Sequence, residues 1–428
     1  MKDDCEGMRA QGFWQAILPN DQGDTSRRST FSYHFDQLIR GVLYVYICVL
    51  PFPRLLVVER NGFIFLAALM AIWCGVNRRH FFCRTPVDLP LAAFVLWVGI
   101  SVPFSASPAY SFGEFAKLLQ QSLVFYLVVF FFQASRHRLR ILVMFLVALI
   151  VSALYGIWRF DTSEIREYYL VQSFMGSEVA LTTFIVMILP LAAAVAVYAR
   201  EPWLRRLSAS TVPVAVVCQL LTFSRAGLLA LFVEAIAIAA IARTRLVAVL
   251  VVVMFVISLS GVGALLYVGD QSKLPFIPVK SKLTTYNLVS RFKAWELGIE
   301  KVREYPFFGM GYGKNMYQRV AQANINNDIA IPMAAGTHNT LLDITVGAGV
   351  PAGLAYLWLM WTIGRTALAQ FYAAHESTRK IWSLALFLMV IGLFTRNFFD
   401  HMWVGSLAVI FWVIVGMAVR PLSPRFEP

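Results

Sequence analysis

The chain has 428 residues, of which 59% are hydrophobic and only 14% are charged. Soluble globular domains are closer to half apolar and a quarter charged, so this composition excludes a large soluble enzyme. The 37 Lys and Arg residues outnumber the 24 Asp and Glu residues. Membrane proteins carry such an excess in their cytoplasmic loops, and we therefore expect membrane lipids around the chain and no nucleic-acid partner.

The N-terminal residues 1–36 are polar and lack the basic start, apolar run and small-residue cleavage site of a signal peptide. We expect them to form a cytoplasmic tail. Long apolar runs recur along the rest of the chain, and about 20 apolar residues cross a bilayer, so the runs predict about twelve membrane spans. The predicted spans are 38–57, 62–76, 87–104, 115–132, 139–158, 174–198, 209–223, 227–241, 246–268, 340–363, 381–394 and 402–419.

Lys and Arg in short loops mark the cytoplasmic side of a membrane protein because they resist translocation. They concentrate in every second connection of this chain, as with Arg78 and Arg79 after the second predicted span and Arg136 after the fourth. This pattern places both chain ends in the cytoplasm and the one long loop outside it. The predicted segments are a tail at 1–36, spans one to nine within 37–268, the long loop at 269–337, spans ten to twelve within 338–420 and a C-terminal tail at 421–428.

The long loop contains a predicted helix between residues 287 and 305, which Pro306 ends. Apolar residues recur there every three or four positions, which is typical of one face of an amphipathic helix. They are Leu288, Phe292, Trp295, Ile299 and Val302. We expect this helix to lie on the membrane surface or on the outer end of the bundle, with its charged face near lipid headgroups.

Two histidines, His338 and His401, lie outside the cytoplasm in this topology. His338 stands where the long loop enters the tenth predicted span, within Gly-Thr-His-Asn-Thr. A histidine with an ordinary pKa of ~6.5 is mostly neutral near pH 7 and can take a proton from an attacking hydroxyl. The alternative is that Thr337, His338 and Asn339 only cap the helix that follows.

Three arginines are also predicted to lie on the outer side. Arg225 occupies a very short turn, Arg291 is on the loop helix with Trp295 one turn on, and Arg396 precedes Asp400 in the last outside loop. The guanidinium group presents a fork of donors that matches phosphate, and it stays charged. Together they predict a pyrophosphate site without a metal. For each arginine alone the alternative is an ion pair or a lipid-phosphate anchor, and for Arg396 alone that alternative is favoured.

Other polar residues are weaker candidates. The glycine-rich segment 309–314 matches neither nucleotide-binding glycine pattern and predicts a turn, with Tyr312 and the nearby Asn339 as neighbours of the site. Glu178 and Glu234 fall within predicted spans, where carboxylates are functional candidates by default. Their roles stay open.

Several short motifs occur in a fixed order over residues 220 to 360. They are Ser-Arg-Ala-Gly at 224–227, the loop with Arg291 and Trp295, Pro-Phe-Phe-Gly-Met-Gly at 306–311, His-Asn-Thr-Leu-Leu at 338–342 and Gly-Ala-Gly-Val-Pro-Ala-Gly-Leu at 347–354. In order and spacing these motifs resemble the bacterial O-antigen ligase and polymerase superfamily. The first half of the chain resembles that superfamily mainly in its number of helices.

The resemblance implies an all-α integral membrane glycosyltransferase with a GT-C-type architecture and one long periplasmic loop. Ligases of the superfamily move O-antigen polysaccharide from an undecaprenyl-pyrophosphate carrier to the lipid A-core oligosaccharide, on the periplasmic face of the inner membrane. They act with inversion and without a metal or another cofactor. The family's essential histidine corresponds to His338, and its essential arginines correspond to Arg225 and Arg291. Further candidates for the site are Trp295, Tyr312, Asn339, Arg396, Asp400 and His401.

Two other functions compete with a ligase. An O-antigen polymerase would extend the carrier-linked glycan instead, and polymerases often divide their outer residues between two sizeable loops, whereas one loop dominates here. A transporter or flippase for lipid-linked sugars would place its binding residues near the membrane midplane and show symmetry between its halves. The candidate residues of this chain gather at the outer face, which favours the ligase.

Overall fold

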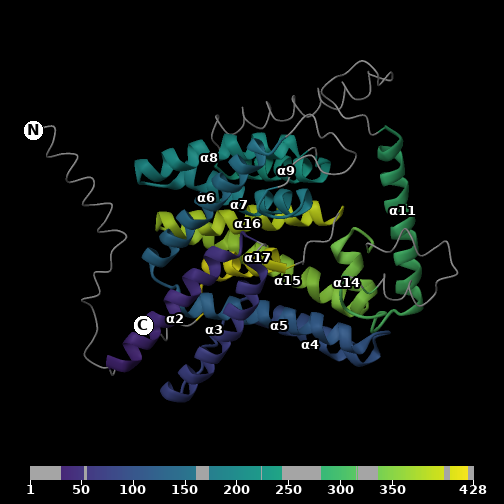
Figure 1. Ribbon diagram of the computed structural model, residues 1–428, viewed down its shortest axis with the longest axis horizontal. Coiled ribbons are helices and arrows are strands. Elements are labelled where there is room, and N and C mark those ends of the chain that lie inside the picture. The colour runs from purple at the N-terminus through teal and green to yellow at the C-terminus, as the bar shows by residue number, and fades with distance from the viewer. Residues whose placement is uncertain are drawn as a thin grey trace, which may run out of the picture.

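The computed structural model describes residues 30–52, 55–160, 173–222, 224–242, 281–314, 316, 336–399 and 405–422. These residues form helices joined by turns, with no strand among them (Figure 1). The predicted spans fall on helices, apart from 246–268, which lies outside the described residues, 38–57, which runs from α2 into the start of α3, and 340–363, which is discussed below. The expected all-α fold is therefore confirmed for the described part of the chain.

The helices of the bundle follow the apolar runs of the sequence. They are α2 (Thr30–Val49), α3 (Leu56–Asn77), α4 (Asp88–Ser101) with the 3-10 turn η2 (Val102–Phe104), α5 (Pro108–Phe131), α6 (Ser135–Trp158), α7 (Glu178–Tyr198), α8 (Pro202–Leu221), α9 (Arg225–Ala242), α11 (Ser281–Glu304), α14 (Thr340–Ala348), α15 (Val350–Ala373), α16 (Ser377–Asn397) and α17 (Gly405–Ala418). Within the described ranges, 7 helices are long and apolar enough to cross a membrane: α3, α5, α6, α7, α8, α9 and α16. The number of twelve spans and the GT-C architecture stay predictions.

Two helices, α7 and α16, pack against each other at the centre of the bundle (Figure 1). Both also contact α6, α9 and α17. The sequence explains the position of α7, because this helix is apolar around its whole circumference. Of its apolar stretch 78% is buried, compared with 28% of the corresponding stretch of α9. A helix that is apolar around its whole circumference is stable only when other helices surround it.

The ends of four helices meet at one end of the bundle, which we call the site end. Thr182 of α7 donates a hydrogen bond to Thr222, directly after α8, over 3.3 Å. Arg396, in the last turn of α16, donates to Thr183 of α7 over 3.1 Å. Because α9 begins at Arg225, only three residues after Thr222, its first turn lies at the same end. The site end therefore collects residues that are far apart in the sequence.

The tenth predicted span, 340–363, is wrong as a single helix. The helix is interrupted at Gly349, which has a φ of 87°, and α14 and α15 form separate helices on the two sides of this break. Pro351 falls in the first turn of α15, where its missing amide proton costs no hydrogen bond. The break makes α14 a helix of only 9 residues at the entrance to α15.

The helix predicted in the long loop is confirmed as α11, which ends at Glu304, two residues before Pro306. Its buried face differs from the predicted stripe, since Phe292 is 57% and Ile299 48% exposed. The buried positions are small, Ala294 and Gly298. Small residues let helix backbones approach closely, and α11 packs on α14 along this side, across the end of the bundle (Figure 1).

Candidate active site

The glycine-rich segment after α11 forms a turn, as predicted, and it pairs with the break between α14 and α15. The backbone amide of Met310 donates to the carbonyl of Val346 over 2.8 Å, and that of Gly311 donates to Gly347 over 2.9 Å. On the other side of the break, Val350 donates to Pro306 over 2.8 Å. These bonds satisfy carbonyl groups that the end of a helix would otherwise leave unpaired, and they fix α14 relative to the end of α11.

Trp97 of α4 stabilises the same junction from the first half of the chain. Its indole nitrogen lies 3.2 Å from the carbonyl oxygen of Phe307 and 3.1 Å from that of Ala348, and it donates to both. Its ring is nearly parallel to that of Phe308, with centroids 6.0 Å apart. No sequence motif pointed to Trp97, because a tryptophan within an apolar run has no periodic feature that separates a packing role from this one.

His338 lies in the turn that leads into α14. It has a φ of 54°, in the left-handed region that residues with a Cβ atom seldom adopt. The side chain of the next residue, Asn339, accepts a hydrogen bond from the amide of Leu342 over 3.0 Å and caps the helix. The capping role is thus confirmed for Asn339, while the half-buried His338 stands one residue before the cap.

Asp343 holds this turn and is a residue that the sequence did not reveal. Its Oδ1 atom accepts hydrogen bonds from the amide of Thr337 over 2.8 Å and from the Thr337 hydroxyl over 2.7 Å. The capping-box pattern would place an acidic residue three positions after the cap, at residue 342. Asp343 is one position later and reaches back past the cap, so that pattern could not have found it.

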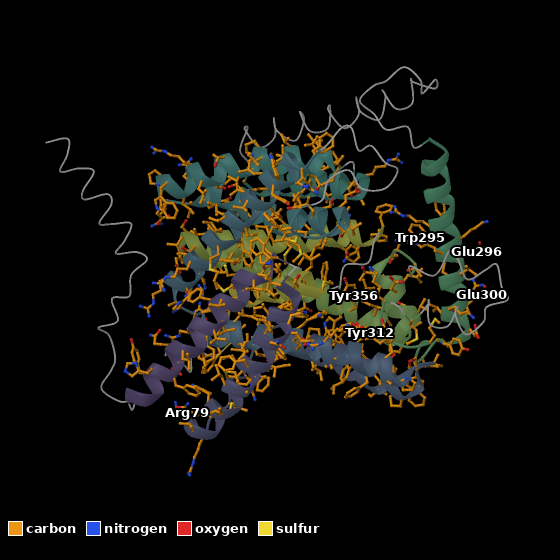
Figure 2. The ribbon with its side chains drawn as sticks, in the orientation of Figure 1. Arg79, Trp295, Glu296, Glu300, Tyr312 and Tyr356 are labelled. Atoms are coloured by element: carbon orange, nitrogen blue, oxygen red, sulfur yellow. The ribbon has the colours of Figure 1, made fainter. Side chains whose placement is uncertain are left out.

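Arg291 and Trp295 lie on α11, which reaches His338 through its small residues. A Cβ atom added at Gly298 would lie 2.8 Å from the methyl group of Thr337, so the helix backbone rests on the residue beside His338. Arg291 precedes Gly298 by two helical turns, about 10 Å along the axis. Figure 2 shows Trp295 on the side of α11 toward the bundle, whereas Glu296 and Glu300 point away from it.

Arg225 is the first residue of α9 and is exposed. Its turn packs tightly against the bundle, because a side chain at Gly227 would overlap Thr182 of α7 and the amide group of Gln219. The hydroxyl of Ser224 accepts a hydrogen bond from the Gly227 amide over 3.3 Å. The close fit at Gly227 fixes the backbone of this turn, and with it the position from which the Arg225 side chain extends.

The placement of Arg396 in an outside loop is wrong. It lies in the last turn of α16 and is only 1% exposed. Its guanidinium group donates to the hydroxyl of Thr183 and, over 3.0 Å, to the carbonyl of Val179, so it joins α16 to α7. The helix α16 continues beyond the apolar run of the sequence because these hydrogen bonds satisfy the charged guanidinium group of Arg396. Asp400 and His401 lie outside the described residues.

Tyr312 lies in the turn after α11, beside Tyr356 of α15 (Figure 2). Burial raises the pKa of the Tyr312 phenol above its ordinary value, and the charge of Glu114 on α5 raises it further. The hydroxyl group therefore stays protonated near neutral pH and can donate a hydrogen bond. The adjacent Gly313, with a φ of 133°, leaves no room for a side chain beside Tyr110 and Glu114.

The structure packs the helix that carries Arg291 on the turn that carries His338, and it sets Arg225 at the site end, as the first residue of α9. Among the residues that the structure describes, no three His, Cys, Asp or Glu side chains gather into a metal site. Arg79, an exposed arginine after α3, lies far from α11 at the other end of the bundle (Figure 2). The arginine side chains on α9 and α11 suit an anionic substrate group.

Comparison with known proteins points to the same part of the chain. Residues 210–357 match the family model for O-antigen ligase, a segment that contains Arg225, Arg291 and His338 and makes up about a third of the chain. No curated protein sequence matches the chain. The chain is thus similar to the O-antigen ligase family over residues 210–357, and its described part contains several helices long and apolar enough to cross a membrane.

Proposed function

We propose that this protein is an O-antigen ligase of the bacterial inner membrane. It transfers O-antigen polysaccharide from undecaprenyl pyrophosphate to the lipid A-core oligosaccharide, at a site that faces the periplasm. The observation that carries the proposal is the packing of Gly298 against Thr337. This contact ties the helix that carries Arg291 to the turn that carries His338.

His338 is the general base in this proposal. A hydroxyl oxygen of the acceptor sugar attacks the anomeric carbon of the donor, and the hydroxyl proton passes to the imidazole as the new bond forms. The bond between the anomeric carbon and the pyrophosphate oxygen breaks from the opposite face, which inverts the configuration. General base catalysis of this kind contributes typically ~10²–10⁴-fold to a rate.

Arg225 and Arg291 bind the pyrophosphate group. Negative charge grows on the leaving oxygen as the glycosidic bond breaks, and fixed guanidinium donors stabilise that charge more in the transition state than in the ground state. This role needs no metal ion. The lipid chain of the donor remains in the bilayer, while its headgroup reaches the arginines of α9 and α11.

The proposal is tested by mixing the purified protein with undecaprenyl-pyrophosphate glycan and lipid A-core, in excess chelator and without nucleotide. A ligase converts lipid A-core to a glycan-bearing product. Growth of the carrier-linked glycan with no product on lipid A-core would identify a polymerase instead. Export of the intact carrier-linked glycan across vesicles, without any new glycosidic bond, would support a flippase.

A further inference from the structure

We infer that Asp343 is a positioning residue that fixes the direction of the His338 imidazole. The inference rests on the proposed function, because it assigns the turn around His338 a task in proton transfer. It starts from the backbone of His338, whose φ of 54° is unfavourable for a residue with a Cβ atom. Such a conformation persists only where the surrounding structure determines it, and it is common at functional sites.

The contacts around His338 converge on one carboxylate oxygen. Asp343 Oδ1 accepts both the amide and the hydroxyl of Thr337, the residue before His338. The Thr337 hydroxyl oxygen in turn accepts the amide of Asn339, the residue after His338, over 3.3 Å. The two neighbours of His338 are therefore tied to the same side chain, and the imidazole leaves the backbone between them.

Asp343 is itself well anchored. Its amide donates to the Asn339 carbonyl over 2.8 Å in the first turn of α14, and its side chain is only 7% exposed. A Cβ atom added at Gly336 would lie 3.3 Å from each carboxylate oxygen, so the backbone of residue 336 passes directly over the carboxylate. A buried carboxylate with these partners is held in one position, because burial without hydrogen bonds would be costly.

The opposite side of Thr337 contacts α11 through Gly298. Thr337 is fully buried between Asp343 on one side and the helix that carries Arg291 on the other. Loss of the Asp343 carboxylate would free the turn to relax toward ordinary backbone angles. His338 would then point away from the position that it holds relative to Arg291.

The test compares Asp343→Ala with Asp343→Asn in the transfer assay. Both hydrogen bonds end on a single oxygen, and the asparagine side chain retains such an oxygen, so Asp343→Asn should keep kcat within about threefold of the wild type. Asp343→Ala should lower kcat by about 10²-fold, the cost of misplacing a reacting group by about 1 Å. The KM values for donor and acceptor should change by less than about threefold, because neither substrate touches Asp343.

Thr345→Ala is the matched control on the same helix. Its hydroxyl donates to the Leu341 carbonyl within α14 and packs on Gly353 of α15, away from the His338 turn. Thr345→Ala should lower the stability of α14 without changing kcat. Hydrogen exchange at the Thr337 amide should rise in Asp343→Ala and stay unchanged in Asp343→Asn. If Asp343→Ala does not fold, Thr337→Val removes the hydroxyl that links Asp343 to the Asn339 amide and should lower kcat about tenfold.

His338→Ala, measured in parallel, separates the two claims. An inactive His338→Ala together with a wild-type kcat for Asp343→Ala would overturn the positioning role and leave the proposed function standing. Equal losses of kcat in Asp343→Asn and Asp343→Ala would also overturn it. A fully active His338→Ala would remove His338 from the mechanism, and the role of Asp343 with it.

Discussion

The backbone of Gly349 lies in contact with the carbonyl oxygen of Phe307, so that a Cβ atom at residue 349 would overlap that oxygen. This contact joins the break between α14 and α15 to the turn that follows α11. Gly349 also has a φ of 87°, which favours glycine. The position of α14, and with it that of His338, depends on this close approach of two backbones.

We expect Gly349→Ala to lower the free energy of unfolding by about 2–4 kcal/mol, through left-handed strain and the overlap with Phe307. Gly113→Ala is the control, because Gly113 is exposed within α5 and a Cβ atom there meets nothing within 4 Å. The thermal unfolding midpoint in detergent measures both variants. Equal midpoints for the two variants would show that the contact does not hold the junction.

Glu234 of α9 and Gly392 of α16 form a second close contact. The Glu234 side chain is 5% exposed, and a Cβ atom at Gly392 would overlap its carboxyl group. We expect Gly392→Ala to cost about 1–3 kcal/mol of stability by overpacking. In a Glu234→Ala background the same substitution should cost much less, since the overlapping group is gone.

The test is a double-mutant cycle of four proteins: the wild type, each single variant and the double variant. Their unfolding free energies give the coupling between the two positions. The same loss of stability on Gly392→Ala in both backgrounds would mean that the Glu234 carboxyl group does not occupy the space beside Gly392. This measurement tests the packing of α9, which carries Arg225 at its start, on the central helix α16.

Arg225 should contribute to the rate more than to donor binding. We expect Arg225→Ala to lower kcat by about 10²–10³-fold at saturating donor, the usual loss for one donor to a developing anion. Arg225→Lys should lose about tenfold, because lysine keeps the charge but not the planar fork. Arg79→Ala, at the far end of the bundle, is the control and should transfer glycan at the wild-type rate. A wild-type kcat for Arg225→Ala would remove it from the site.

Much of the fold could be predicted from the sequence because apolar runs of sufficient length have few alternatives in a bilayer. The existence and the end of α11 and the turn at 309–314 were also predictable, the former from periodicity and Pro306 and the latter from its glycines, although α11 begins at Ser281, six residues before the predicted start. The break at Gly349 was not. A single glycine in an apolar run has the same appearance whether the helix continues or the backbone of Phe307 approaches it.

The candidate site was predictable only in part. His338, Arg225 and Arg291 were found by residue type and by the order of their motifs; the structure sets Arg225 at the site end and packs the helix of Arg291 on the turn of His338. The buried position of Arg396 was missed, because its partner Thr183 lies 213 positions away in the sequence. Asp343 was missed because its hydrogen bonds depend on the left-handed turn at His338, which periodicity does not predict.

The central claim is that His338 takes the proton of the acceptor hydroxyl. The most direct measurement is the single-turnover rate of glycan transfer by His338→Ala, beside His80→Ala, which changes an exposed histidine in the connection between α3 and α4. Donor binding is measured in the same preparations. We predict a loss of at least about 10²-fold in rate for His338→Ala, with wild-type donor affinity, and no loss for His80→Ala. Transfer by His338→Ala at the wild-type rate would contradict the account.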